Sequence, residues 1–191
     1  MIVYPLRLHD CSLVSDGAAA LVLAPTEDAK KISTRAVEIS GIGMATDRLA
    51  EKNRDNLYEL TAGKVAVKKS FSDANITIDD VDFAEVHDCF SINQILTTEA
   101  LGLSKDGQAG FDYINQRFRP GDSCPVNLSG GLKAKGHPVG ATGASMHALA
   151  FKQLVGEPIG MAPIKKHPEV GVVFNVGGSG ATNCVTTLKR I

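Results

Sequence analysis

Hydrophobic and polar residues follow two kinds of pattern along the 191-residue chain. Short apolar runs bounded by turn residues are typical of buried strands, and apolar residues three or four positions apart are typical of half-buried helices. The runs predict five strands, at residues 18–23, 37–45, 81–86, 170–176 and 181–188. The helical spacing predicts helices at residues 26–31, 57–74, 91–101 and 144–154. Strands that alternate with helices favour an α/β fold, with helices packed on the faces of a sheet.

Glycine gathers where the chain is expected to turn sharply. The 19 glycines concentrate at residues 130–143 and 171–180. Because glycine has no Cβ, such clusters mark tight turns or a close approach of the backbone to another group. The turn at residues 177–180 predicts that the last two strands form a hairpin or a bulged edge. Gly102 is expected to cap the helix before it, and residues 103–123 are expected to be irregular.

Composition and charge exclude several classes of protein. Hydrophobic residues make up 43% and charged residues 21%, with 20 basic and 21 acidic side chains, so no strong field favours nucleic acid or an anionic membrane. No apolar run approaches the roughly 20 residues that span a bilayer, and the first residues do not resemble a signal peptide. Scattered cysteines argue against a zinc site or a disulfide framework, and they fit a reducing compartment such as the cytoplasm. These cysteines are Cys11, Cys89, Cys124 and Cys184.

The first candidate site is His87-Asp88-Cys89-Phe90, at the end of a predicted strand and the start of a predicted helix. A cysteine near a helix N-terminus is expected to favour the thiolate, which suits a nucleophile or a proton carrier. His87, two residues away, could act as a base or donate a hydrogen bond to an oxyanion. The alternative is that Cys89 is a small buried hydrophobic residue and His87 a structural one, and spacing alone favours that alternative.

The second candidate site is the glycine-rich stretch around His137, which runs from Gly136 to Gly143 before a predicted helix. Pro138 fixes the backbone after the histidine, and the glycines let the main chain approach a ligand. A histidine in this setting is a candidate general base. The alternative is a turn that only binds an anion at the helix N-terminus, but the stretch lacks the Walker A and dinucleotide-binding patterns.

The third candidate is the turn Asn175-Val-Gly177-Gly-Ser-Gly180, whose free amides could form an oxyanion hole. A glycine turn in a hairpin needs no further explanation, so this signal is weak by itself. The remaining histidines and cysteines have no supporting context and are expected to be structural or on the surface.

Taken in order, these motifs resemble those of thiolases. The resemblance rests on Ser15-Asp-Gly-Ala-Ala-Ala20, Glu85-Val-His-Asp-Cys-Phe90, Asn127-Leu-Ser-Gly-Gly-Leu132 and Lys135-Gly-His-Pro-Val-Gly-Ala-Thr-Gly143, followed by the late glycine turn. Within the family, the chain is similar to the sterol-carrier-protein-type and bacterial or archaeal branch, which has H-D-C-F where other thiolases have N-E-A-F. The resemblance covers essentially the whole chain as a C-terminal half. It implies a mixed five-stranded sheet covered by helices on both faces.

The resemblance also implies a role for individual residues. His137 would activate the nucleophilic cysteine, and Cys89 would carry the proton to and from the α-carbon of the acetyl group. His87 would point into one oxyanion hole, and the amide of Gly177 would serve a second. Ser12 falls near a serine that contacts the pantetheine arm of CoA. The resemblance implies no metal and no cofactor, because the CoA thioester is itself the substrate.

The covalent nucleophile of thiolases lies in their N-terminal half, so the resemblance implies that this chain is inactive in isolation. Residues 1–33 would be the tail end of the N-terminal domain, and residues 34–191 the C-terminal domain. Cys11-Ser12 superficially resembles a nucleophile motif, but it precedes Ser-Asp-Gly at the end of the first half and is rejected.

The leading hypothesis is the C-terminal part of an acyl-CoA C-acyltransferase, which catalyses Claisen condensation or thiolysis of 3-ketoacyl-CoA. Its expected partners are acyl-CoA and the missing N-terminal half or a second chain, and a homo-oligomer is expected. Neither nucleic acid nor a membrane is an expected partner. The alternatives are a catalytically silent module that binds acyl-CoA or a protein, and a symmetric pair of copies that imitates the full core.

Overall fold

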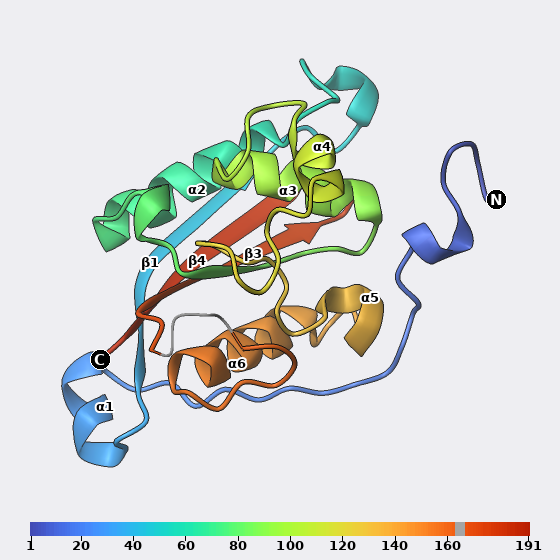
Figure 1. Cartoon of the computed structure of the whole chain (residues 1–191). Coiled ribbons are helices and arrows are strands. Elements are labelled where there is room, and N and C mark those ends of the chain that lie inside the picture. Colours follow the sequence, from blue (N-terminus) through green and yellow to red (C-terminus); the bar gives the residue numbers. More distant parts are fainter. Residues whose placement is uncertain (163–166) are drawn as a thin grey trace.

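The computed structural model of the chain describes residues 1–162 and 167–191. Figure 1 shows a central sheet with helices above and below it. The strands are β1 (Val37–Thr46), β2 (Phe83–Val86), β3 (Val170–Gly177) and β4 (Thr182–Arg190). The helices are α1 (Thr26–Ile32), α2 (Thr61–Ala74), α3 (Ser91–Leu101), α4 (Ala109–Ile114), α5 (Gly131–Lys135) and α6 (Thr142–Leu154).

Within the described residues the sheet is mixed, with four strands in the order β1-β4-β3-β2. β3 and β4 form the antiparallel hairpin that the glycine turn predicts, and β1 lies antiparallel to β4 at one edge. β2 pairs in parallel with β3, from Phe83 opposite Gly171 to Val86 opposite Phe174. This parallel pair brings the carboxyl ends of β2 and β3 to the same edge of the sheet.

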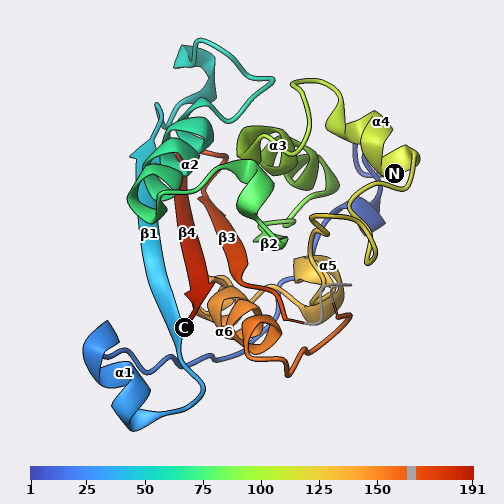
Figure 2. The same cartoon turned by 60° about the vertical axis from the view of Figure 1, so that its left-hand side comes forward.

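The prediction of a fifth strand, at residues 18–23, is wrong. This segment does not join the sheet and leaves its apolar side chains exposed, with 98% of Val22 and 72% of Leu23 accessible to solvent. A strand needs a neighbour for its amide and carbonyl groups, and this segment pairs with neither of the edge strands β1 and β2. Both views show the segment passing beyond α6 on its way to α1 (Figures 1 and 2).

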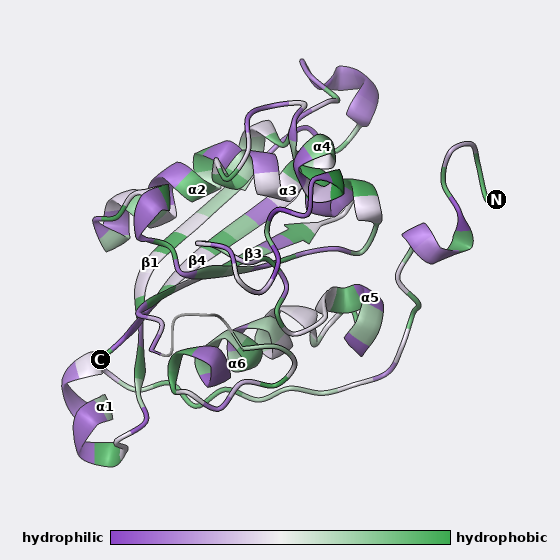
Figure 3. Ribbon diagram, viewed as in Figure 1, coloured by the Kyte–Doolittle hydropathy of each residue, from purple (hydrophilic) through white to green (hydrophobic). Residues whose placement is uncertain are grey.

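Helices cover both faces of the sheet, as expected, and each face has its own hydrophobic core. On one face α2 and α3 pack against β3 and β4, around buried residues such as Phe71, Phe174 and Val185. On the other face α5 and α6 contribute Leu132, Met146 and Leu154 to a second core with Phe83 and Val173. β2 and most of β3 are buried on both faces, as two separate cores require. Figure 3 shows hydrophobic residues on the strands and on the helices that cover them.

Three helix predictions need correction. Helix α2 begins at Thr61 rather than residue 57. The expected irregular region 103–123 contains the short helix α4. The glycine-rich stretch before α6 contains the short helix α5, which begins after Gly130 adopts a positive φ of 95°. None of the described helices is long and apolar enough to cross a membrane.

Candidate functional site

His87 and His137, predicted from different motifs, meet at the carboxyl edge of β2 and β3. His87 directly follows β2, and its amide donates to the Phe174 carbonyl on β3 over 3.0 Å. His137 lies in the loop between α5 and α6. The two ring centroids are 5.0 Å apart, and the ring planes are nearly perpendicular at 85°. Such an edge of parallel strands is where α/β proteins commonly place their sites.

His87 is held as a neutral imidazole. The residue is buried, and burial lowers the pKa of its ring from 6.5 to about 4, with a further lowering by the charge of His137. The side chain of Asn175 on β3 opposes this shift by hydrogen bonding to the ring. Nδ1 of His87 is buried and has no hydrogen-bond partner among the described residues. The neutral ring therefore has one hydrogen-bonding position that no described residue uses.

Hydrogen bonds determine the tautomer of His137. Its Nδ1 lies 2.7 Å from Oγ1 of Thr142, and this hydroxyl donates its only proton to the Pro138 carbonyl over 3.0 Å. The hydroxyl must therefore accept from Nδ1–H, so the neutral ring carries its free lone pair on Nε2. Burial and the charge of Lys135 lower the pKa of His137, which keeps Nε2 available as a base.

Cys89 does not match the expectation of a stabilised thiolate. Burial raises the pKa of its thiol, and the backbone hydrogen bond at Phe90 only partly opposes that effect. The side chain is half-buried and packs against the core that α5 and α6 form with the sheet. α3 begins two residues later, at Ser91, and burial outweighs any benefit from its N-terminus. The resting state of Cys89 is a neutral thiol.

Two buried carboxylates connect the loops that carry these residues. Asp88 accepts the Leu132 amide over 2.7 Å and the Lys133 amide over 3.4 Å, so it caps the first turn of α5. Glu85 accepts the amide of Ser129 over 3.0 Å and its hydroxyl over 2.5 Å. Asp88 thus ties the loop of His87 and Cys89 to α5, and Glu85 ties the end of β2 to the glycine-rich stretch that leads to His137.

Lys135 places a positive charge beside this cluster. Burial lowers the pKa of its ammonium group, while the charges of Glu85 and Asp88 oppose that shift. Its Nζ donates to the Ser145 hydroxyl over 3.1 Å. The same charge contributes to the lowered pKa values of both histidines.

The remaining sequence-predicted residues lie close by. The amide of Ser12 donates to the Cys89 carbonyl over 2.8 Å. Gly177 ends β3 two residues after Asn175, which faces His87. Within the described residues, no group of three or more His, Cys, Asp or Glu side chains could hold a metal ion.

Sequence reasoning missed the roles of Thr142, Asp88 and Lys135, although all three lie inside the quoted motifs. Asp88 and Lys135 have partners outside their own motifs, whereas Thr142 contacts His137 within its motif. Only Thr142, five residues after His137, had a spacing that could have suggested its contact.

Comparison with known proteins identifies similar sequences. The profile described as thiolase C-terminal domain-like matches residues 43–190. The acetyl-CoA acetyltransferase of Methanothermobacter thermautotrophicus is 40% identical over 190 residues, which are 100% of this chain and 49% of that protein. Human sterol carrier protein 2 is 37% identical over 193 residues, covering 97% of this chain and 34% of that protein. The chain thus spans about half the length of the acetyltransferase and a smaller share of the sterol carrier protein.

A solved structure supports the fold. The Ltp2-ChsH2(DUF35) aldolase superposes on all of this chain with a TM-score of 0.83, at 19% sequence identity, and 49% of the aldolase chain is covered. At this level of identity the likeness concerns the fold alone.

Proposed function

Because the chain belongs to the thiolase family, as a counterpart of its C-terminal domain, we propose that it supplies the acid–base and oxyanion-binding residues of an acyl-CoA C-acyltransferase. The complete enzyme carries out Claisen condensation or thiolysis of a 3-ketoacyl-CoA. The observation that carries the proposal is the pair of neutral histidines 5.0 Å apart, with the Cys89 thiol on the same loop as His87.

His137 is the base for the nucleophile in this proposal. Its Nε2 takes the proton of a cysteine thiol from the N-terminal half of the enzyme, and the resulting thiolate attacks the thioester carbonyl of acyl-CoA. The acyl carbon then forms a bond to the cysteine sulfur, and its bond to the CoA sulfur breaks. Thr142 supports this step because it keeps the other ring nitrogen protonated.

His87 and Gly177 stabilise negative charge in this proposal. Removing a proton from the carbon next to a thioester places charge on the thioester oxygen, which needs hydrogen-bond donors aimed at it. A ring with a pKa of about 4 stays neutral at pH 7 and donates through an N–H without becoming charged. The amide of Gly177, at the end of β3, serves the oxygen of the acyl-enzyme.

Cys89 carries the proton of the carbon acid. In thiolysis the neutral thiol gives its proton to the α-carbon as the carbon–carbon bond of the 3-ketoacyl chain breaks. In condensation Cys89 first gives its proton to the CoA thiolate that leaves on acylation, and the Cys89 thiolate so formed takes a proton from the α-carbon of acetyl-CoA. The carbanion attacks the acyl-enzyme, and the bond between the acyl carbon and the nucleophilic cysteine sulfur breaks. The raised pKa of the thiol makes its conjugate thiolate a stronger base for this purpose.

The N-terminal half of a thiolase, on the same polypeptide or on another, supplies the nucleophilic cysteine. In this proposal residues 1–33 are the tail end of the N-terminal domain, and residues 34–191 form the C-terminal domain. The exposed apolar side chains of residues 18–23 fit this division, because they lack a strand to pair with in this chain. Acyl-CoA would bind across both halves, with Ser12 near its pantetheine arm.

The first test is the intact mass of natively purified protein after brief exposure to acetyl-CoA. A gain of one acetyl group on a cysteine of the N-terminal half is expected, with no gain on this chain. Replacing Cys89 with Ala in the complete enzyme should leave this acetylation in place and abolish condensation. Normal turnover by the Cys89→Ala enzyme would remove Cys89 from the mechanism, and a complete enzyme that is never acetylated would indicate a silent acyl-CoA or partner-binding module instead.

A further inference from the structure

Residues 11–17, which precede the first helix, contact both loops of the candidate site. The amide of Ser12 donates to the Cys89 carbonyl over 2.8 Å, and Cys11 forms an antiparallel bridge with Phe90. Three residues further on, Val14 forms a parallel bridge with His137. The segment therefore spans from the loop of Cys89 to the loop of His137.

Ser15 makes the most direct contact with the second loop. Its Oγ accepts the backbone N–H of His137 over 2.7 Å. This amide lies between Gly136 and Pro138, outside any helix, so it has no helical partner of its own. The serine oxygen thereby fixes the backbone position from which the imidazole of His137 projects.

The segment that carries Ser15 and the loop that carries His137 approach each other closely at two glycines, Gly136 and Gly17. A Cβ on Gly136, whose φ is +93°, would lie 2.7 Å from the Ser15 Oγ. A Cβ on Gly17 would lie 2.9 Å from Cγ of Pro138. Contacts below 3.0 Å force a shift of one partner, so the two glycines allow the segment and the loop to approach closely enough for the serine to reach the amide.

We infer that Ser15 is a positioning residue for His137. The structural part of this inference stands by itself, and only the expected effect of Ser15 on turnover rests on the proposed function. Ser15 fixes the backbone of His137, and Thr142 fixes its ring. Ser15 lies within residues 1–33, the proposed tail of the N-terminal domain. The base of one domain is therefore placed by a residue of the other, and a shift of the N-terminal tail would displace Nε2 from the nucleophile.

Amide hydrogen exchange of His137, followed by NMR in the full 191-residue chain, tests the inference without any need for activity. In Ser15→Ala the His137 amide should exchange at least about tenfold faster, since a lost hydrogen bond of this kind corresponds to about that factor, while the amides of α2 and β4 keep their protection. Ser15→Cys, which keeps the size but offers a weak acceptor, should show the same loss. The matched control is Val14→Ala, because Val14 is 91% exposed and truncation of its side chain should leave the exchange rate of the His137 amide unchanged.

An unchanged exchange rate for His137 in both Ser15 variants would overturn the inference. In the complete enzyme, Ser15→Ala should lower kcat about 10- to 100-fold and leave KM for acyl-CoA nearly unchanged, because a displaced base weakens the transition state more than the bound substrate. An unchanged kcat would likewise overturn it. Wild-type enzyme without acylation would refute the proposed function, and the exchange result would still decide the role of Ser15.

Discussion

At the scale of single residues, the site depends on groups that burial keeps neutral. The pKa of His87 falls to about 4 and the pKa of the Cys89 thiol rises, in both cases mainly through burial. Neutral donors and acids can face an oxyanion or a carbanion without first giving up a charge. The buried Glu85 follows the same rule, because burial raises its pKa from 4.5 to about 7.

Thr142→Val should remove the hydrogen bond that keeps His137 in the tautomer protonated on Nδ1. Valine matches the shape of threonine but cannot accept from Nδ1–H, so both neutral tautomers become populated. The ¹⁵N chemical shifts of the His137 ring, measured above its pKa, should move from a pattern with a bare Nε2 toward the average of the two forms. Thr142→Ser keeps the hydroxyl and serves as the control. Identical ring shifts in the wild type and in Thr142→Val would show that the hydroxyl does not determine the tautomer.

Glu85→Gln should change how stability depends on pH. In the folded protein the carboxyl stays protonated up to about pH 7, whereas in the unfolded chain it ionises near 4.5. Raising the pH between these values therefore favours unfolding of the wild type, and the glutamine variant escapes this effect. The free energy of unfolding of the variant minus that of the wild type should rise by up to about 3 kcal/mol across this window and be flat above it.

Urea titrations at pH values from 4.5 to 8 measure this difference. Taking the difference cancels the titration of His87 and His137, whose lowered pKa values act in the opposite direction because the unfolded chain binds their protons first. A difference that does not vary with pH would mean that Glu85 ionises in the folded protein as it does in water.

At the scale of elements, a close approach between β1 and α2 determines how one layer packs on the sheet. Cβ atoms added at Gly41 and Gly43 would lie 2.1 Å from the Ser70 carbonyl oxygen and 1.8 Å from the Ala66 carbonyl oxygen. Ser70 also bonds across to the sheet, since its hydroxyl lies 2.8 Å from that of Thr187 on β4. The helix backbone thus rests directly on the strand.

Gly43→Ala should force α2 away from β1 and lower the free energy of unfolding by about 3 kcal/mol or more, the upper range for overpacking a core. Gly140→Ala is the matched control, because a Cβ there would have no atom within 4 Å, and it should change stability by less than about 0.5 kcal/mol. Urea unfolding monitored by circular dichroism gives both values. Equal effects would mean that the β1–α2 contact can relax at little cost.

Local sequence patterns correctly predicted those strands, turns and helix ends that are specified by residues within the element itself. The apolar runs found β1 to β4, the glycine turn found the β3–β4 hairpin, and Gly102 caps α3 with a φ of 84°. Residues 18–23 have the same apolar pattern as a strand, but strand pairing depends on a neighbour, which the pattern does not encode. Helix α5 was missed because the Asp88 side chain that caps it comes from a distant position in the chain.

The sequence likewise predicted the reactive residues of the candidate site but not the contacts that position them. His87, Cys89 and His137 stand out because their motifs combine reactive side chains with turn residues. Burial raises the pKa of the Cys89 thiol, against the thiolate that its position before a helix favours, because the extent of burial is a property of the fold and not of the motif. Ser15 and Thr142 act through contacts whose geometry no spacing rule specifies.

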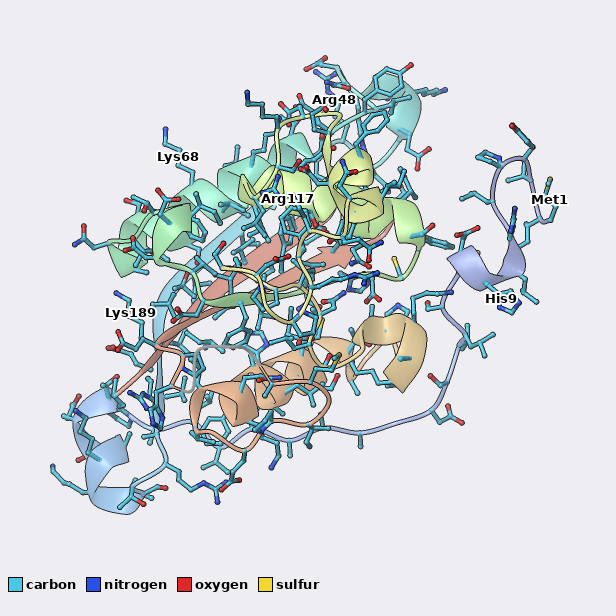
Figure 4. The ribbon with its side chains drawn as sticks, in the orientation of Figure 1. Met1, His9, Arg48, Lys68, Arg117 and Lys189 are labelled. Atoms are coloured by element: carbon cyan, nitrogen blue, oxygen red, sulfur yellow. The ribbon has the colours of Figure 1, made fainter. Side chains whose placement is uncertain are left out.

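At the scale of the whole molecule, the sheet face that carries α6 is incompletely covered. Gly41 and Gly43 face α2, so Ile42 between them points to the opposite face, and after it Met44 does the same. Each of these two side chains is 55% exposed at the edge of the sheet. On the α2 side the sheet is covered, and Lys68 projects from the outer surface of that helix, away from the strands (Figure 4). In the proposed enzyme, the N-terminal half covers the exposed apolar face.

Ile42→Ser should therefore weaken association with a separately produced thiolase N-terminal half while leaving this chain folded. An exposed apolar side chain contributes little to the stability of the isolated chain, but burying it against a partner is favourable by an amount that corresponds to about a tenfold change in Kd. Val65→Ser is the matched control, because Val65 is 44% exposed on α2, on the other side of the sheet. Titration calorimetry should show weaker binding for Ile42→Ser only. Equal binding by both variants would place the partner elsewhere, and equal weakening would mean that it contacts both faces.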